Sequence, residues 1–229
     1  MKRVQAATGQ VCTGRSMVPA LLLYGGVWGF TEATIGHLLH LVPRMAAVPP
    51  LAGLVMFPVG VVFMLAAVHA TGKPAAAVGV AMVAAAIKAS SVVLAPVSWL
   101  FVQNPALSIM MEGLVVWAFV AAFSMHTSSC GSLVRTLSLA IGAAVGWRVL
   151  FVLTHLVLGI QWGLLARGAP AVLQFVLLDS AVNGVLITVL LSARLSQRLA
   201  SPSAVLMRPV PVGAILVLAV VAEYVTSVV

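Results

Sequence analysis

The chain has 229 residues, of which 62% are hydrophobic and only 7% are charged, and its mean hydropathy is +1.19. A soluble globular domain carries about a quarter charged residues, so this composition excludes a water-soluble fold and indicates a chain that folds in lipid. The formal net charge of +8 would suggest a nucleic-acid partner in a soluble protein. Here most of the basic residues flank apolar runs, which is the pattern of a membrane protein and argues against nucleic-acid binding.

Seven apolar stretches follow one another, at residues 17–43, 50–71, 75–95, 105–126, 133–160, 170–193 and 211–229. Each is close to the length of about 20 residues that a helix needs to cross the hydrocarbon core. Prolines mark most of the predicted helix starts, because the first helical turn makes no use of the missing N–H. The clearest is Asn104-Pro105, predicted as an N-cap followed by the first helical residue.

These stretches predict an all-α fold, a polytopic transmembrane helix bundle of about seven spans, or six if the last stretch does not cross. Residues 1–16 are expected to form a cytoplasmic N-terminal tail and residues 17–229 a single transmembrane helical domain. Three stretches carry small residues four apart, which lets helix backbones approach closely in a membrane. These pairs are Gly25 and Gly29, Ala81 and Ala85, and Gly142 and Gly146.

The loop charges predict the orientation, since cytoplasmic loops of membrane proteins are enriched in Lys and Arg. With the N-terminus inside, the cytoplasmic segments contain Lys2, Arg3, Arg15, Lys73, Arg135, Arg194, Arg198 and Arg208, and the outer segments contain Arg44 and Arg167. We therefore predict a multi-pass protein of a prokaryotic inner (plasma) membrane with a cytoplasmic N-terminus. Cys12 and Cys130 then lie on the cytoplasmic side without a metal-binding spacing, as two reduced thiols.

Many ionisable residues lie inside the predicted spans, where each costs at least about 2.5–3.5 kcal/mol unless it is paired or hydrated. At a rise of about 1.5 Å per residue, almost all of them fall in the outer half of the bundle. We therefore predict one ligand pocket there, lined by Glu32, His37, His40, Lys88, Glu112, Arg148, His155 and Asp179. By depth, Lys88 with Glu112 and Arg148 with Asp179 are candidate ion pairs. The alternative is that such pairs only support helix packing.

His37 and His40 are three residues apart and share one helical face. Together they could bind a transition metal if another helix added ligands such as Glu112 or His155, or they could relay protons or hydrogen-bond a polar ligand. Either one opposite His155 would also meet the depth requirement for bis-His haem ligation. The alternative is a pair of interfacial histidines near a helix end. The cofactor therefore stays open between none, a transition metal and haem.

The sequence contains no GxSxG, no HExxH and no closely spaced acidic pair on one helix, which favours a protein that is not an enzyme. The segment from Gly29-Phe30-Thr31-Glu32 to Gly36-His37 faintly resembles the motif of bacterial undecaprenyl-diphosphate phosphatases. The Pro-Ile-Ser-Ser core of that motif is missing, so the activity is not carried over.

Over the whole chain, the size, the basic cytoplasmic side and the many small residues resemble the substrate-binding membrane subunits (S components) of energy-coupling-factor transporters. The likeness is architectural and has no specific motif, and the predicted seventh span departs from the six that are usual there. Ala81 and Ala85 resemble the small-residue faces with which those subunits contact their coupling subunit.

The resemblance implies a solute-binding or transport protein with a polar pocket in the outer half of the bilayer. Its partners would be the lipid bilayer, a small-molecule or ion ligand and further membrane subunits. One alternative is a membrane subunit of a respiratory or other electron-transfer complex that binds quinone or haem. Another is a membrane enzyme that acts on a lipid-linked substrate.

Overall fold

The computed structural model describes residues 16–39, 51–95, 97–123, 133–160, 163–201 and 205–228. These residues are predominantly helical and contain no strand. Six of their helices are long and apolar enough to cross a membrane, as judged from length and composition. The prediction of an all-α, polytopic membrane bundle is therefore confirmed.

The helices follow the predicted stretches closely. Their bounds are α1 Met17–Thr31, η1 Glu32–Gly36, α3 Ala52–Thr71, α4 Ala76–Ala89, α5 Ser91–Leu94, α6 Trp99–Phe123, α7 Leu133–Val157, η3 Leu165–Arg167, α8 Ala169–Leu173, η4 Gln174–Leu178, α9 Asp179–Ser192, α10 Leu195–Leu199 and α11 Pro209–Val228. The short segments η1 and η4 are π-helices, and η3 is a 3₁₀ turn. The first predicted span is helical from Met17 to Leu39, but η1 interrupts its α-helical part. The last predicted span, α11, is one of the six long helices.

The predicted helix start at Asn104-Pro105 is wrong. Helix α6 begins at Trp99, so Pro105 lies inside the helix, where its ring leaves a carbonyl one turn earlier without an N–H partner. The Asn104 side chain does not cap the helix and instead makes a tertiary contact, with Oδ1 at 2.9 Å from Nε2 of His155. Other proline signals are confirmed, since Pro170 lies in the first turn of α8 and Pro209 is the first residue of α11.

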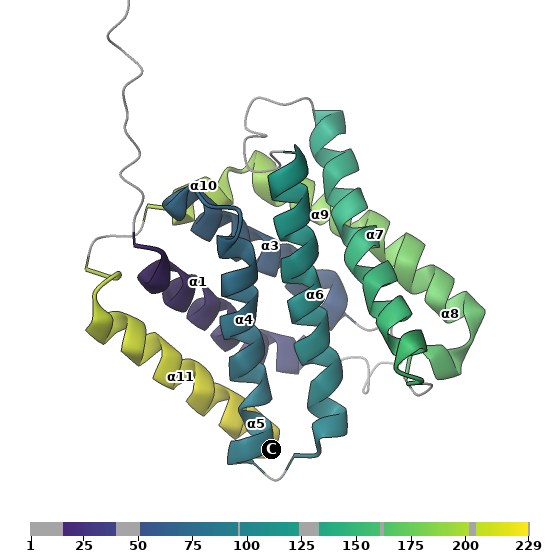
Figure 1. Ribbon diagram of the computed structural model, residues 1–229, viewed down its shortest axis with the longest axis horizontal. Coiled ribbons are helices and arrows are strands. Elements are labelled where there is room, and N and C mark those ends of the chain that lie inside the picture. The colour runs from purple at the N-terminus through teal and green to yellow at the C-terminus, as the bar shows by residue number, and fades with distance from the viewer. Residues whose placement is uncertain are drawn as a thin grey trace, which may run out of the picture.

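The spatial order of the helices differs from their chain order (Figure 1). Helix α1 packs between α4 and the C-terminal α11, α4 packs on α6, and α6 packs on α7, which in turn packs on α9. Helix α3 contacts α1, α4 and α9 and has the largest buried share of the six long helices. The last helix of the chain therefore returns to the first.

The small-residue pairs lie where helices approach most closely, as predicted. A Cβ built on Gly29 of α1 would lie 2.5 Å from Cδ1 of Ile87 on α4. A Cβ on Gly113 of α6 would lie 2.3 Å from that of Ala81 on α4. Neither glycine can therefore accept a side chain without separating its helix from α4.

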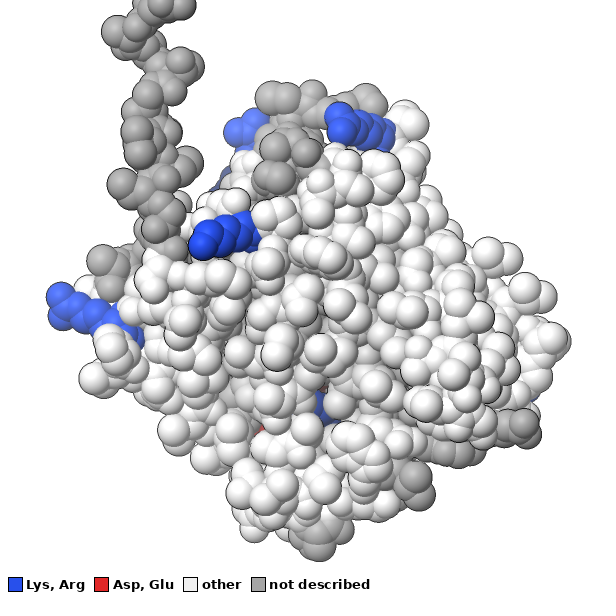
Figure 2. Space-filling model, viewed as in Figure 1, with Lys and Arg blue, Asp and Glu red and all other residues white. Residues whose placement is uncertain are grey.

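Exposed basic residues gather along one end of the bundle, which runs from the left edge to the upper edge of the view in Figure 2. They are Lys73, Arg135, Arg194, Arg198 and Arg208. Lys73, Arg194, Arg198 and Arg208 lie between long helices, and Arg135 lies in the first turn of α7. Because successive long helices alternate in direction, all five residues come to this end, called here the basic end. Arg167 lies in the α7–α8 connection, at the opposite end of the bundle. The predicted orientation depends on this separation between the five basic residues at one end and Arg167 at the other.

Candidate functional site

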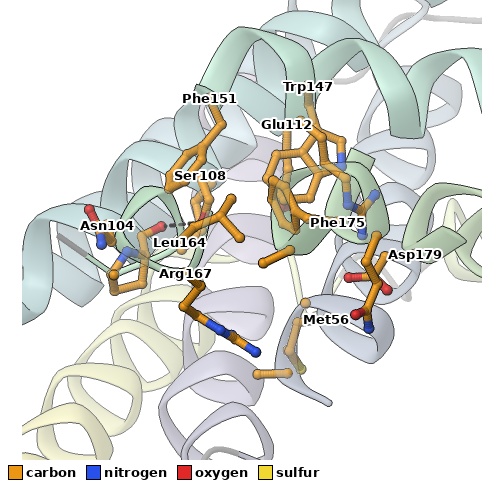
Figure 3. Close-up of a pocket in the computed structure, with 18 of the residues that line it drawn as sticks. Met56, Asn104, Ser108, Glu112, Trp147, Phe151, Leu164, Arg167, Phe175 and Asp179 are labelled. Carbon is orange, nitrogen blue, oxygen red and sulfur yellow. Dashed lines mark hydrogen bonds between the residues drawn. The ribbon is translucent and has the colours of Figure 1, made fainter. Parts of the chain in front are cut away.

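A cavity of about 410 Å³ lies near the end of the bundle opposite the basic end (Figure 3). Its walls come from η1, the start of α3, α6, α7 and the segment from η3 to Asp179. Five charged side chains line it, namely Glu32, Glu112, Arg148, Arg167 and Asp179. A volume of about 300–1,000 Å³ is usual for a small-molecule site, so the cavity has the size for an organic ligand.

Four of the eight residues predicted for a ligand pocket line this cavity, namely Glu32, Glu112, Arg148 and Asp179. His37, Lys88 and His155 lie outside its lining, and His40 falls outside the described residues. Half of the residues that the sequence analysis grouped by depth therefore line the same cavity.

Glu32 is placed by the π-helical turn η1, which it begins. Its side chain is 8% exposed and folds back along the helix, so that a Cβ on Gly36 would lie 3.1 Å from the carboxyl carbon. A larger residue at position 36 would require the Glu32 carboxylate to shift by a few tenths of an ångström. Within the described part of the chain, Glu32 has no hydrogen-bond or ion-pair partner.

Glu112 faces the cavity from α6 and is 6% exposed. Its neighbour Gly113 lies against Ala81 of α4, and successive residues of a helix are rotated by about 100°, so Glu112 is turned away from α4. Among the residues that the structure describes, no side chain forms a hydrogen bond or an ion pair with it. Glu32 and Arg148 are nevertheless near enough to interact with it electrostatically.

The predicted pair of Lys88 with Glu112 is wrong. Lys88 Nζ of α4 lies 3.0 Å from Oε1 and 3.1 Å from Oε2 of Glu223 on α11. The matched depth of Lys88 and Glu112 was a sound estimate, but the rotation of α6 points Glu112 to the other side. Glu223, which is 1% exposed, is the ion-pair partner of Lys88 instead.

Arg148 is fully buried in α7 and uses its guanidinium to join α7 to α9. Nη1 donates to Oγ of Ser180 and to the carbonyl of Ala144, both at 3.3 Å, and Nη2 donates to Oδ1 of Asn183. The predicted ion pair with Asp179 is not formed. Asp179 interacts with Arg148 only at longer range. The hydrogen bonds of Arg148 go instead to Ser180 and to Asn183, one turn further along α9.

This network extends to the central helix, because Nδ2 of Asn183 donates to the carbonyl of Leu54 on α3 at 2.7 Å. The three helices that surround one side of the cavity are thus tied together through a single arginine. Nε of Arg148 is the exception, since this buried N–H has no partner among the described residues. Nε1 of Trp147, which also lines the cavity, is likewise buried without a partner.

Aromatic side chains form one wall of the cavity (Figure 3). Trp147 lies 5.6 Å from Phe175 and 6.3 Å from Phe151 between ring centroids. The guanidinium carbon of Arg148 lies 4.6 Å from the ring centroid of Trp147 and 5.1 Å from that of Phe175, within the range of cation–π attraction. The sequence did not predict these aromatic residues as part of a site, because they do not stand out in so apolar a chain.

Both π-helices of the described chain border the cavity. Segment η1 supplies Glu32, and η4 supplies Gln174 and Phe175 and ends at Asp179. Single π-helical turns inside α-helices are rare and occur frequently at functional sites, because they rotate side chains away from the regular helical path. Arg167 was predicted only as an outer-loop charge. Its side chain reaches from η3 toward the labelled lining residues in Figure 3.

His155 does not line the cavity, and both of its ring nitrogens have partners. Nδ1 lies 2.9 Å from the carbonyl of Phe151, to which it can only donate, and Nε2 lies 2.9 Å from the Asn104 amide. A metal or haem ligand needs a nitrogen that is free to coordinate, so this geometry suits a structural histidine. The described residues include no group of three or more His, Cys, Asp or Glu that could hold a metal. A metal site at His37 and His40 stays a prediction.

Comparison with known proteins assigns no role to the chain. No family model, no curated protein and no solved structure matches it. The function is therefore argued from the cavity alone.

Proposed function

We propose that this membrane protein binds a small polar solute in the cavity and serves as the binding component of a transport system. One observation supports this most strongly. Glu32 and Glu112 are more than nine-tenths buried, border the same cavity and have no hydrogen-bond or ion-pair partner in the described part of the chain.

The energetics of the bilayer favour a ligand over a structural role for these two carboxylates. An ionisable group at membrane depth costs at least about 2.5–3.5 kcal/mol, and two neighbouring carboxylates also repel each other. Apolar residues of similar size would serve packing as well or better, even where a charge has a partner. A bound solute would supply the partners that the protein itself does not provide.

Access to the cavity supports uptake from outside. Its lining includes the start of α6 and the η3 connection, at the end opposite the basic end. If the basic end is cytoplasmic, as the loop charges predict, the cavity opens toward the outer face. Solute-binding membrane subunits capture their ligands in this arrangement.

The two alternatives from the sequence receive no specific support. Both nitrogens of His155 are engaged, so the histidine expected to face a haem is turned to other partners. The cavity-lining hydroxyl of Ser108 donates to the carbonyl of Pro105 at 2.9 Å, so its proton is directed to the backbone and not to a general base as in an enzyme nucleophile. Binding is the activity that the lining residues support best.

Native mass spectrometry of the protein purified from its own membranes tests this proposal. We expect a small molecule to remain bound to the unmodified protein and to be lost from Glu112→Gln. The matched control is the double variant Lys88→Gln with Glu223→Gln, which removes a carboxylate outside the cavity and should retain the molecule. Retention by all three proteins, or its absence from the unmodified one, would contradict the proposal.

Reporter fusions test the direction of access. A reporter fused after Arg198 should be cytoplasmic, and one inserted in residues 161–167 should be external. The opposite pattern would place the cavity on the cytoplasmic side and would contradict uptake from outside.

A further inference from the structure

The charges around the cavity are unbalanced in its buried part. Glu32 and Glu112 are both buried there, and the one buried cation is Arg148. Arg167 is exposed on η3, and Asp179 is only partly buried at the start of α9. The interior of the cavity therefore holds two carboxylates against one guanidinium.

The buried cation is also engaged elsewhere. The Nη atoms of Arg148 donate to the carbonyl of Ala144 and to the side chains of Ser180 and Asn183, so neither carboxylate receives a hydrogen bond from it. Lys88 cannot substitute, because its ammonium lies 3.0 Å from Glu223. Among the described residues, Lys88 interacts with Glu32 only at longer range, and the exposed Arg167 forms no hydrogen bond or ion pair with either carboxylate.

The aromatic wall suits a positive charge as well. Arg148 lies within cation–π distance of Trp147 and Phe175. Protonated amines are commonly held between carboxylates and aromatic faces.

We propose that the cavity binds an organic cation, a small molecule with a protonated amine attached to a flat apolar group. The amine lies between Glu32 and Glu112, and the apolar group packs on Trp147, Phe151 and Phe175. Its charge completes the balance of the buried part, whereas an anionic ligand would add a third negative charge to it. This inference names the ligand class for the proposed function and rests on it.

Three probes with the same phenylethyl group and different charges test the inference. They are phenethylamine, 2-phenylethanol and 3-phenylpropionate, measured by calorimetry at pH 7 with the full chain in nanodiscs of uncharged lipid. We expect the amine to bind at least tenfold more tightly than the alcohol, and the acid to bind least. Glu112→Gln should weaken amine binding at least tenfold and leave alcohol binding within about twofold.

Two further variants keep the test decisive. Glu32→Gln should reproduce the loss of charge preference, and it replaces Glu112→Gln if that variant fails to fold. The double variant Lys88→Gln with Glu223→Gln removes a carboxylate and an ammonium outside the cavity, and it should keep the tenfold preference.

The outcomes separate this inference from the proposed function. Equal binding of the three probes, or preference for the acid or the alcohol, overturns the cation inference and leaves a solute-binding cavity in place. Binding of none of them also overturns the cation inference. If native mass spectrometry then finds no bound molecule either, the proposed function fails with it.

Discussion

Two groups of buried charges lie in the same half of the bundle, away from the basic end, and they are built differently. Lys88 and Glu223 form a closed ion pair between α4 and α11, 3.0 Å apart, and Glu223 is 1% exposed. Glu32 and Glu112 border a cavity, and no described side chain pairs with them. The first group is complete within the protein and suits a structural role. The second group has no such partner within the described part of the protein, which suits the binding role proposed for it.

The largest effect is expected for the closed pair. Lys88→Met leaves the carboxylate of Glu223 buried without a charged partner and should lower the free energy of unfolding by about 3–5 kcal/mol. The double variant Lys88→Met with Glu223→Leu removes both charges and should cost much less. Unfolding in mixed micelles, followed by tryptophan fluorescence, measures both. Equal losses in the single and double variants would show that the ion pair does not stabilise the fold.

A smaller effect is expected where Arg148 joins the helices around the cavity. Arg148→Lys keeps the charge but loses the planar fork that reaches Ser180 and Asn183 together, and hydrogen bonds to charged groups contribute about 1.5–3 kcal/mol. The same unfolding measurement should show a loss in that range. An unchanged stability would mean that Arg148 serves the ligand and does not stabilise the fold.

The contact between Asn104 and His155 should contribute less again. Asn104→Ala removes one hydrogen bond at the edge of the cavity and should cost about 1 kcal/mol. In a double-mutant cycle with His155→Ala, the coupling energy should be about 0.5–1.5 kcal/mol. Strictly additive losses would show that the two side chains do not interact.

The helices could be predicted because their signals are local. Apolar runs about 20 residues long, interrupted by proline and charge, give the length and depth of a span without knowledge of its neighbours. The failure at Asn104 shows the limit of such signals. A side chain that would cap an isolated helix was needed for a contact with α7, fifty-one positions along the chain. Only the tertiary structure distinguishes these two uses.

For the candidate site, the sequence predicts how deep each residue lies in the bundle but not the direction of its side chain. Position along a span gives depth at about 1.5 Å per residue, and four of the residues grouped in this way line one cavity, namely Glu32, Glu112, Arg148 and Asp179. The direction of a side chain also depends on which helices are neighbours. Because α11 returns to α1 and α4, Lys88 meets Glu223 and not Glu112.

Other parts of the cavity had no signal in the sequence. The two π-helical turns have no composition that distinguishes them from their flanking α-helices. Aromatic residues such as Trp147 and Phe175 resemble ordinary lipid-facing or core positions in a chain that is 62% hydrophobic. The sequence analysis therefore named four of the five charged residues that line the cavity, and the structure added Arg167 and the apolar wall.

The stability and the solute affinity of Glu112→Gln together test the central claim most directly, that this carboxylate serves a ligand and not the fold. Because the substitution removes a buried carboxylate without a protein partner, the free energy of unfolding of the solute-free protein should not fall. Affinity for the solute that co-purifies with the unmodified protein should fall by at least about 1–3 kcal/mol, since the bound group loses its charged partner. A loss of stability of about 3 kcal/mol or more with unchanged affinity would contradict the account and would make Glu112 a structural residue like Glu223.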